Sequence, residues 1–297
     1  MDDNLFLVPR EVAGDKYGFE FFANLAGSTL LLRNQEIVID FESCNFFEGN
    51  LCSILGNILD SCIERGNRIS IKNLIGNVRG AISRNGFLQN FASSISSPNL
   101  FQTSVPYRRF KMEDESIAKD FFKVELFEKQ KMPKMSPLAQ KEIIRNIFEV
   151  CLNAVTHGEC EYIYCCGQVY LRKNTPKAVL TFTDLGKTIK ANVNNYLAEN
   201  KSGIDAIRWA LTDGNTTKTA AIPGGLGLKL LQDLIHLNKG TLQFISADGF
   251  VEVCEGKVNS SSLEIDFPGT IVTIELLLKD PNFYILNTEK NDWDDFF

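Results

Sequence analysis

Three polar residues of different chemistry follow one another at intervals of four near the middle of the chain: Glu149, Asn153 and His157. On a helix, this spacing places the three side chains on one stripe of the surface. A carboxylate one turn before a carboxamide can hold a water molecule as general base, while the amide oxygen binds a hard cation such as Mg²⁺. This is chemistry for phosphoryl transfer, although the pattern alone also fits a solvated helix face.

The helix that would carry these residues is well delimited in the sequence. Ser136 followed by Pro137 is typical of a helix start, and Gly158 is typical of a helix end. Between them, apolar residues recur at spacings of three and four, which is the pattern of a helix with one buried face. We therefore expect a single amphipathic helix of about six turns.

Two further polar motifs follow this helix. Residues 177–183 have the alternation of a β-strand that ends in Asp184 and Gly186. A carboxylate there can accept a hydrogen bond from an exocyclic amine such as that of adenine, or it can simply form a turn. Residues 223–228 are rich in glycine and lead into an apolar helical pattern. Glycines that open a helix let backbone N–H groups approach a polyphosphate, although a flexible loop is the alternative.

In combination, these motifs resemble the Bergerat-fold (GHKL) ATPases, the superfamily of DNA gyrase, histidine kinases and the MutL mismatch-repair proteins. Residues 149–157 are similar to the N box, in the form usual for the anti-sigma-factor type of kinase domain. Residues 184–189 are similar to the first glycine box and residues 225–228 to the second. Residues 210–218 resemble the ATP lid, and residues 269–274 resemble the last strand of the family.

The resemblance implies a role for each matching residue. Glu149 would orient or activate the nucleophile, and Asn153 would bind Mg²⁺. Asp184 would accept a hydrogen bond from the adenine amine, with Gly186 allowing the base to approach. One departure is Thr188, which stands where the family has a second glycine. The other nucleotide-binding residues implied in this way are Ile189, Lys218, Gly225, Leu226, Gly227, Leu228 and Thr273.

The function implied by this resemblance is Mg-dependent ATP binding by a regulatory protein, with slow ATP hydrolysis coupled to closure of the lid. Two alternatives stay open: a serine protein kinase of the anti-sigma type that acts on a partner, and a non-catalytic ATP-binding interaction module. The presence of Glu149 favours an ATPase or a kinase over the module. A sensor histidine kinase is disfavoured because neither of the two histidines lies in a helix ahead of the ATP motifs. We expect a protein partner, which can be a second copy of the chain.

The first 90 residues predict a different unit. Residues 36–41 and 67–72 have the alternation of strands, with a helical pattern between them, so we expect a βαβ arrangement. This segment resembles the STAS domains of anti-sigma antagonists, in which a serine at the helix start receives phosphate. Here the aligned positions hold Gly49 and Asn50, and Ser53 follows one turn later. Further segments predicted from the pattern are strands over 17–24 and 28–33 and helices over 49–65 and 75–87.

The predicted fold class is α/β with two units. Residues 1–90 form the STAS-like regulatory unit, and residues 91–118, which contain a polar stretch and two prolines, form a linker. Residues 119–282 form the histidine-kinase-like ATPase unit, an α/β sandwich whose mostly antiparallel sheet carries helices on one face. Residues 283–297 form an acidic and aromatic tail.

Composition limits the class of protein. A formal net charge of −6 argues against broad affinity for nucleic acid, which requires cations that neutralise phosphates. Eight cysteines lie mostly in apolar stretches without paired C-x-x-C spacing, which favours reduced core thiols. No apolar run reaches the roughly 18 residues that cross a bilayer, and the first residues lack a signal-peptide pattern. We therefore expect a cytoplasmic protein that does not bind membranes.

Overall fold

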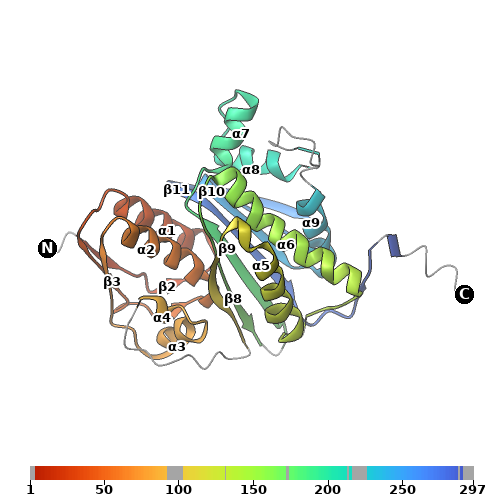
Figure 1. Ribbon diagram of the computed structural model, residues 1–297, viewed down its shortest axis with the longest axis horizontal. Helices are drawn as coiled ribbons and strands as arrows, with labels where there is room; N and C mark the ends of the chain where they lie inside the picture. The colour runs from red at the N-terminus through yellow and green to blue at the C-terminus, as the bar shows by residue number, and fades with distance from the viewer. Residues whose placement is uncertain are drawn as a thin grey trace, which may run out of the picture.

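The computed structural model describes most of the chain. The described residues are 4–91, 103–130, 132–171, 174–212, 214–215, 226–286 and 288–289. Within helices, the side chains of residues 112, 150–157 and 226–230 lie outside this description. The protein has an α/β architecture, in which a central sheet separates two groups of helices (Figure 1).

The central sheet has five strands in the order β10-β11-β9-β8-β6, and every neighbouring pair is antiparallel. The strands are β6 (Ser104–Phe110), β8 (Ile163–Tyr170), β9 (Lys177–Asp184), β10 (Thr241–Cys254) and β11 (Lys257–Leu277). The prediction of a mostly antiparallel sheet is thus confirmed. The predicted strand over residues 177–183 is also confirmed and includes Asp184 as its last residue.

One face of this sheet is covered by helices that lie between its strands in the sequence. The longest is α6 (Pro137–Gly158), whose start is capped by Ser136, because the Ser136 side chain accepts a hydrogen bond from the N–H of Ala139. Ile147 and Phe148 of α6 pack with Leu180 and Phe182 of β9 in one buried cluster. Its companions on this side are α5 (Glu115–Phe122), the π-helical turn η3 (Lys123–Glu128) and α9 (Leu226–Asn238). Beyond the sheet end lie α7 (Ile189–Leu197) and α8 (Gly203–Leu211).

The amino-terminal unit is built on a three-stranded parallel sheet in the order β1-β3-β5. Its strand, helix and parallel strand over β3, α2 and β5 match the predicted βαβ arrangement. The main elements are β1 (Leu5–Leu7), α1 (Lys16–Thr29), β3 (Glu36–Asp40), α2 (Cys52–Glu64), β5 (Arg68–Lys72) and α3 (Gly76–Arg84). Short elements complete it: β2 (Glu11–Val12), β4 (Phe46–Phe47), η1 (Gly49–Leu51) and α4 (Leu88–Phe91).

The two strands predicted over residues 17–24 and 28–33 are wrong: the first segment lies within α1, and the second holds the last two residues of α1 and then a turn, with no strand residue. Asp15 caps this helix by accepting a hydrogen bond from the N–H of Gly18. Phe19, Phe22 and Ala26 are buried at the spacing of a helix face rather than at the alternation of a strand. The aromatic residues have high strand propensity, which the helical spacing overrides.

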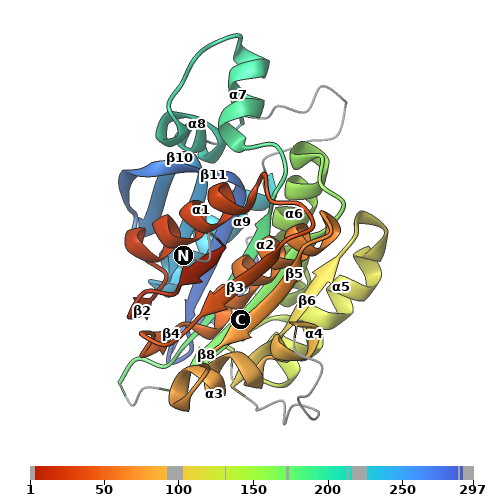
Figure 2. The same ribbon diagram turned by 90° about the vertical axis from the view of Figure 1, so that its left-hand side faces the viewer.

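Helices α1 and α2 cover the second face of the central sheet. Phe19 and Phe22 of α1 belong to the same buried cluster as Tyr164 of β8 and Ile271 of β11, and the ring of Phe19 lies 5.4 Å from that of Phe250. Figure 2 looks onto this unit, with α1 in front of β10 and β11. The central sheet is therefore covered on both faces, whereas the prediction placed helices on one face alone.

The predicted linker over residues 91–118 is wrong for its second half. Residues 104–110 form β6, an edge strand of the central sheet, and η2 (Met112–Asp114) and α5 follow directly. Val105 and Tyr107 are buried, and the pairing with β8 shifts its register around Pro106, because proline has no N–H to donate. Residues 92–102 lie outside the described residues.

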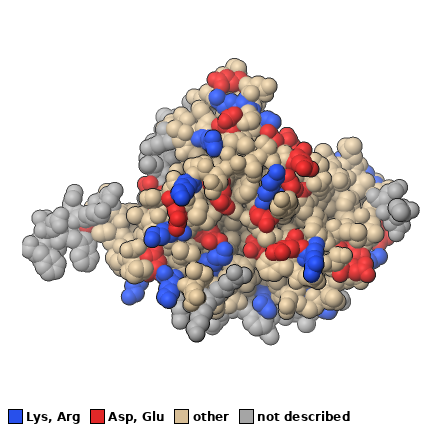
Figure 3. All heavy atoms as spheres, turned by 180° about the vertical axis from the view of Figure 1, so that it is seen from behind, with Lys and Arg blue, Asp and Glu red and all other residues tan. Residues whose placement is uncertain are grey.

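Other predictions concern the tail and the surface. Of the predicted tail, residues 283 and 284 form β12 (Phe283–Tyr284), which pairs with β7 (Lys134–Met135), and residues 290–297 lie outside the described residues. On the face seen in Figure 3, acidic and basic side chains alternate. None of the helices in the described part of the chain has the length and apolar character needed to cross a membrane.

The docking of α1 on the sheet predicts a large effect for one aromatic side chain. Phe19→Ala should lower the free energy of unfolding by about 3–5 kcal/mol, because it empties a fully buried site between α1 and the sheet. Tyr17→Ala, on the exposed side of the same helix, should change it by less than about 0.5 kcal/mol. Denaturant unfolding of both variants measures this. Equal effects would mean that α1 is not packed on the sheet.

Candidate functional site

The candidate site is centred on the carboxylate of Asp184, the last residue of β9. Its side chain is on the α6 side of the sheet and is 1% exposed. Oδ1 accepts a hydrogen bond of 2.9 Å from the N–H of Gly186. Oδ2 is buried and has no hydrogen-bond partner among the described residues. A buried acceptor without a donor is costly, so this oxygen is suited to receive a donor from a ligand.

The environment of Asp184 also changes its acidity. Burial raises the pKa of Asp184 to about 7. The N–H of Gly186, which donates to Oδ1, opposes this increase, as does the nearby N–H of Thr270, which makes no hydrogen bond to Oδ2. Burial and the nearby charge of Asp184 together raise the pKa of Cys160 to about 12. The Asp184 carboxyl group therefore titrates near neutral pH, while the Cys160 thiol stays protonated.

Two glycines bring the end of α6 against the turn that follows β9. A Cβ atom on Gly186 would lie 2.1 Å from the carbonyl oxygen of Gly158, which accepts a hydrogen bond from the N–H of Lys187. A Cβ atom on Gly158 would lie 3.1 Å from Oδ1 of Asp184. The left-handed residue at the end of α6 is Glu159, so Gly158 is needed for close approach rather than for its backbone angles. The glycines thus join the end of α6 to Asp184.

Ser246 and Thr270 complete this end of the sheet, and neither was among the site residues predicted from the sequence. Ser246 Oγ accepts a hydrogen bond from the N–H of Ile189 and donates one to the carbonyl of Gly269. Its oxygen lies 3.3 Å from Oγ1 of Thr270, which is the register partner of Asp184. The only sequence signal for Thr270 is its place at the start of the predicted last strand, because its position opposite Asp184 depends on strand pairing.

The structure does not bring Thr273 to Asp184. Thr273 Oγ1 lies 3.1 Å from Oγ1 of Thr181, and Thr181 Oγ1 accepts a hydrogen bond from the amide of Asn50 in the amino-terminal unit. Because side chains alternate along a strand, Thr181 and Thr273 face α1 and α2 while Asp184 faces α6. In this fold, Thr273 therefore lies on the other face of the sheet from Asp184. Thr270 occupies the position beside Asp184.

Thr188, which stands where the Bergerat-fold ATPases that the sequence resembles have a second glycine, has a structural role. Its side chain accepts a hydrogen bond of 3.1 Å from the N–H of Ala191 and caps the start of α7. A glycine at this position would lose that cap. The segment after Asp184 thus leads directly into a helix, and Ile189 is the first residue of that helix, with its N–H held by Ser246.

Glu149 lies on α6, nine residues before Gly158, which corresponds to about 13 Å along the helix axis. Its side chain is 35% exposed, and its Oε1 lies 3.5 Å from Nε of Arg145. Arg145 also pairs with Glu142 at 3.2 Å. A ligand anchored at Asp184 would have to extend along α6 to reach Glu149, whose carboxylate is accessible from solvent.

The other predicted site residues are described only in part. Asn153 lies in α6, and Leu226, Gly227 and Leu228 form the first turn of α9, but their side chains are not among those described. Lys218 and Gly225 lie outside the described residues. Helix α9 packs beside α6, and its start at Leu226 is where the glycine-rich motif predicted a helix.

The segment that resembles a STAS phosphorylation site is buried. Asn50 is fully buried, and its amide donates to Thr181 of the central sheet. Ser53 is also fully buried, and its hydroxyl donates to the carbonyl of Asn50. A phosphate group on Ser53 has no room in this packing, so the helix start serves as a docking contact.

Comparisons with known proteins give no family for this chain. No protein-family model matches it, and no curated protein matches it. The case for a function therefore depends on the residues and the geometry described above.

The raised pKa of Asp184 predicts how stability depends on pH. An ordinary aspartate has a pKa of 3.8, so between pH 4 and 7 the unfolded chain loses this proton while the folded chain keeps it. The wild type should therefore lose stability as pH rises through this window. In Asp184→Asn this loss is absent, so its stability relative to the wild type should increase by on the order of 2 kcal/mol between pH 5 and 8.

Thermal or denaturant unfolding at several pH values measures this difference. Asp266→Asn, which removes an exposed carboxylate on β11, is the matched control and should track the wild type. If the difference between Asp184→Asn and the wild type is constant over the whole range, the Asp184 carboxyl group is not held protonated by burial.

Proposed function

We propose that this protein binds ATP and Mg²⁺ where β9, the end of α6 and the start of α9 meet, and hydrolyses ATP slowly as a regulatory protein. The observation that carries the proposal is the unpartnered, buried Oδ2 of Asp184. This oxygen is a hydrogen-bond acceptor without a donor. It lies at the strand end where the sequence motifs predict that the adenine amine binds. The resemblance to Bergerat-fold ATPases supports the same ligand.

Adenine fits this acceptor better than guanine does. The exocyclic group of adenine is an amine, which can donate to Oδ2, whereas guanine presents a carbonyl oxygen in the corresponding position. A guanine carbonyl facing the ionised carboxylate of Asp184 would leave both oxygens without a donor. The N–H of Gly186 is already used by Oδ1, so it does not satisfy a guanine oxygen. The site is therefore expected to prefer ATP over GTP.

Glu149 is the residue we assign to activation of the attacking water. Its carboxylate is accessible, and Arg145 on the preceding turn holds it by an ion pair. Mg²⁺ would be held by the amide oxygen of Asn153 and would neutralise charge on the phosphates. The backbone N–H groups at the start of α9, at Leu226 and Gly227, would face those phosphates. Closure of the segment that contains Lys218 would change contacts with a protein partner or a second copy.

A kinase that phosphorylates its own amino-terminal unit is not favoured. Ser53 is fully buried against the central sheet and is used as a hydrogen-bond donor. A serine kinase acting on a separate protein would use the same ATP site, with Glu149 activating a hydroxyl group instead of water.

Nucleotide selectivity tests the adenine contact. In Asp184→Asn, the amide oxygen would accept from Gly186 and the amide NH₂ would face the ligand, so two donors would meet at the adenine amine. We expect ATP affinity to fall by about 10- to 100-fold and the preference over GTP to be lost. Calorimetric titration with Mg-ATP and Mg-GTP measures both, with Asp266→Asn as control. Unchanged ATP affinity in Asp184→Asn would contradict the proposed contact.

Phosphate release tests the role of Glu149. Glu149→Gln should keep ATP binding and reduce the rate of phosphate release by about 100-fold or more, because the amide cannot take a proton from water. Glu142, two helical turns before Glu149, also pairs with Arg145. The Glu142→Gln variant removes that carboxylate and should keep the wild-type rate of phosphate release. If both variants lose activity equally, the ion pairs of Arg145 are what matters. If the wild type binds ATP without releasing phosphate, hydrolysis is excluded.

A further inference from the structure

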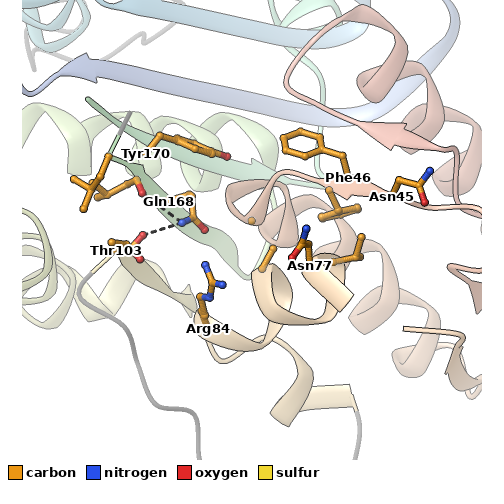
Figure 4. A pocket seen from close by; sticks show the side chains of 13 residues that line it. Asn45, Phe46, Asn77, Arg84, Thr103, Gln168 and Tyr170 are labelled. Carbon is orange, nitrogen blue, oxygen red and sulfur yellow. Dashed lines mark hydrogen bonds between the residues drawn. The ribbon is translucent and has the colours of Figure 1, made fainter. Parts of the chain in front are cut away.

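A cavity of about 520 Å³ lies between the amino-terminal unit and the central sheet, apart from the site described above. Its walls come from β4 and α3 on one side and from the end of β8 on the other (Figure 4). Tyr170, at the end of β8, pairs with Lys177 at the start of β9, whereas Asp184 is at the opposite end of β9. Seven residues of strand, about 23 Å, therefore separate the two places. The volume of the cavity is in the range that holds a small-molecule ligand.

One face of α3 lines this cavity. Asn77, Ala81 and Arg84 are spaced by four and three residues, so they lie on the same side of the helix. The first turn of α3 has no acidic residue, and its N-cap residue, Ile75, offers no side-chain hydrogen bond to the N–H groups. The start of the helix is therefore an electropositive border of the cavity, and Arg84 in the last turn adds a full positive charge.

Two aromatic rings form the side of the cavity that faces Arg84. Figure 4 shows the rings of Phe46 and Tyr170 on one side, the Arg84 guanidinium on the other, and the side chains of Gln168 and Asn77 between them. Phe46 is 38% exposed, which is high for a phenylalanine beside a cavity. The Tyr170 hydroxyl donates to Oδ1 of buried Asn50 at 3.3 Å, which fixes its ring in place. Such rings suit a planar, π-rich group.

The polar lining consists of carboxamides and one cation. Gln168 is 8% exposed, and its Nε2 donates to the carbonyl of Thr103 at 3.0 Å. Asn45 and Asn77 are the other two carboxamides, and none of the described lining residues is acidic. In a chain with a net charge of −6, a cavity with a cation and no carboxylate is suited to an anion. Carboxamides can both donate to and accept from the edge of a heterocycle.

We propose that this cavity is a second binding site and that its ligand is a nucleoside monophosphate. The base stacks on Phe46 and Tyr170, the carboxamides of Asn45 and Asn77 meet the edge of the base, and the phosphate binds the guanidinium of Arg84. Because both units contribute walls, the bound ligand links α3 to β8. The ligand thereby stabilises the docked arrangement of the amino-terminal unit.

Calorimetric titration of the protein with AMP, GMP, CMP and UMP, each tested separately, examines the proposal. At least one should bind, with the same affinity in the wild type and in Asp184→Asn, because the latter changes only the ATP site. Arg84→Ala and Phe46→Ala should each weaken the affinity for that nucleoside monophosphate by about 10-fold or more, a change of about 1.4 kcal/mol. Arg79→Ala, which removes a charge from α3 outside the cavity lining, should leave the affinity unchanged.

Three results would overturn the proposal. The first is that no nucleoside monophosphate binds at concentrations up to about 1 mM. The others are that inorganic phosphate binds as tightly as the nucleoside monophosphate, or that Arg79→Ala weakens binding as much as Arg84→Ala. Loss of binding in Asp184→Asn would instead assign the monophosphate to the ATP site. Arg84→Lys keeps the charge without the planar fork and should give an intermediate affinity. Thermal unfolding of each variant without ligand separates a lost contact from a lost fold.

Discussion

Burial of the central sheet on both faces is the constraint on which the rest of the structure depends. Helix α6 covers one face of β9 and helices α1 and α2 cover the other, so Thr181, Thr183 and Asp184 are almost entirely shielded from bulk water. Thr181 meets this constraint through Asn50. Asp184 meets it only halfway, because one carboxylate oxygen accepts from Gly186 and the other has no partner in the described structure. The candidate site is thus a consequence of how the sheet is enclosed.

The same enclosure links the two units of the chain. The amino-terminal unit packs α1 and α2 on the sheet, and Asn50 at the start of α2 donates a hydrogen bond to Thr181 of β9. In such a fold, a ligand on the α6 side and a ligand near α3 act on opposite ends of the same strands. If the two sites are coupled, each ligand changes the binding free energy of the other by the same amount.

The sequence correctly predicted the elements whose ends are marked by local residue signals. Ser136 and Gly158 delimit α6, and the alternation before Asp184 delimits β9. Helix α1 was missed because aromatic residues favour strands, although the spacing of Phe19 and its neighbours is helical. Thr270 was missed because its place opposite Asp184 depends on the pairing register of β9 and β11, which no local pattern states.

The most direct measurement is a structure of the protein with Mg²⁺ and a non-hydrolysable ATP analogue. The account predicts that the exocyclic amine of adenine lies about 2.9 Å from Oδ2 of Asp184 and that the phosphates extend along α6 toward Glu149. Binding of the analogue with its base elsewhere, or a protein group bonded to Oδ2 in place of the base, would contradict it.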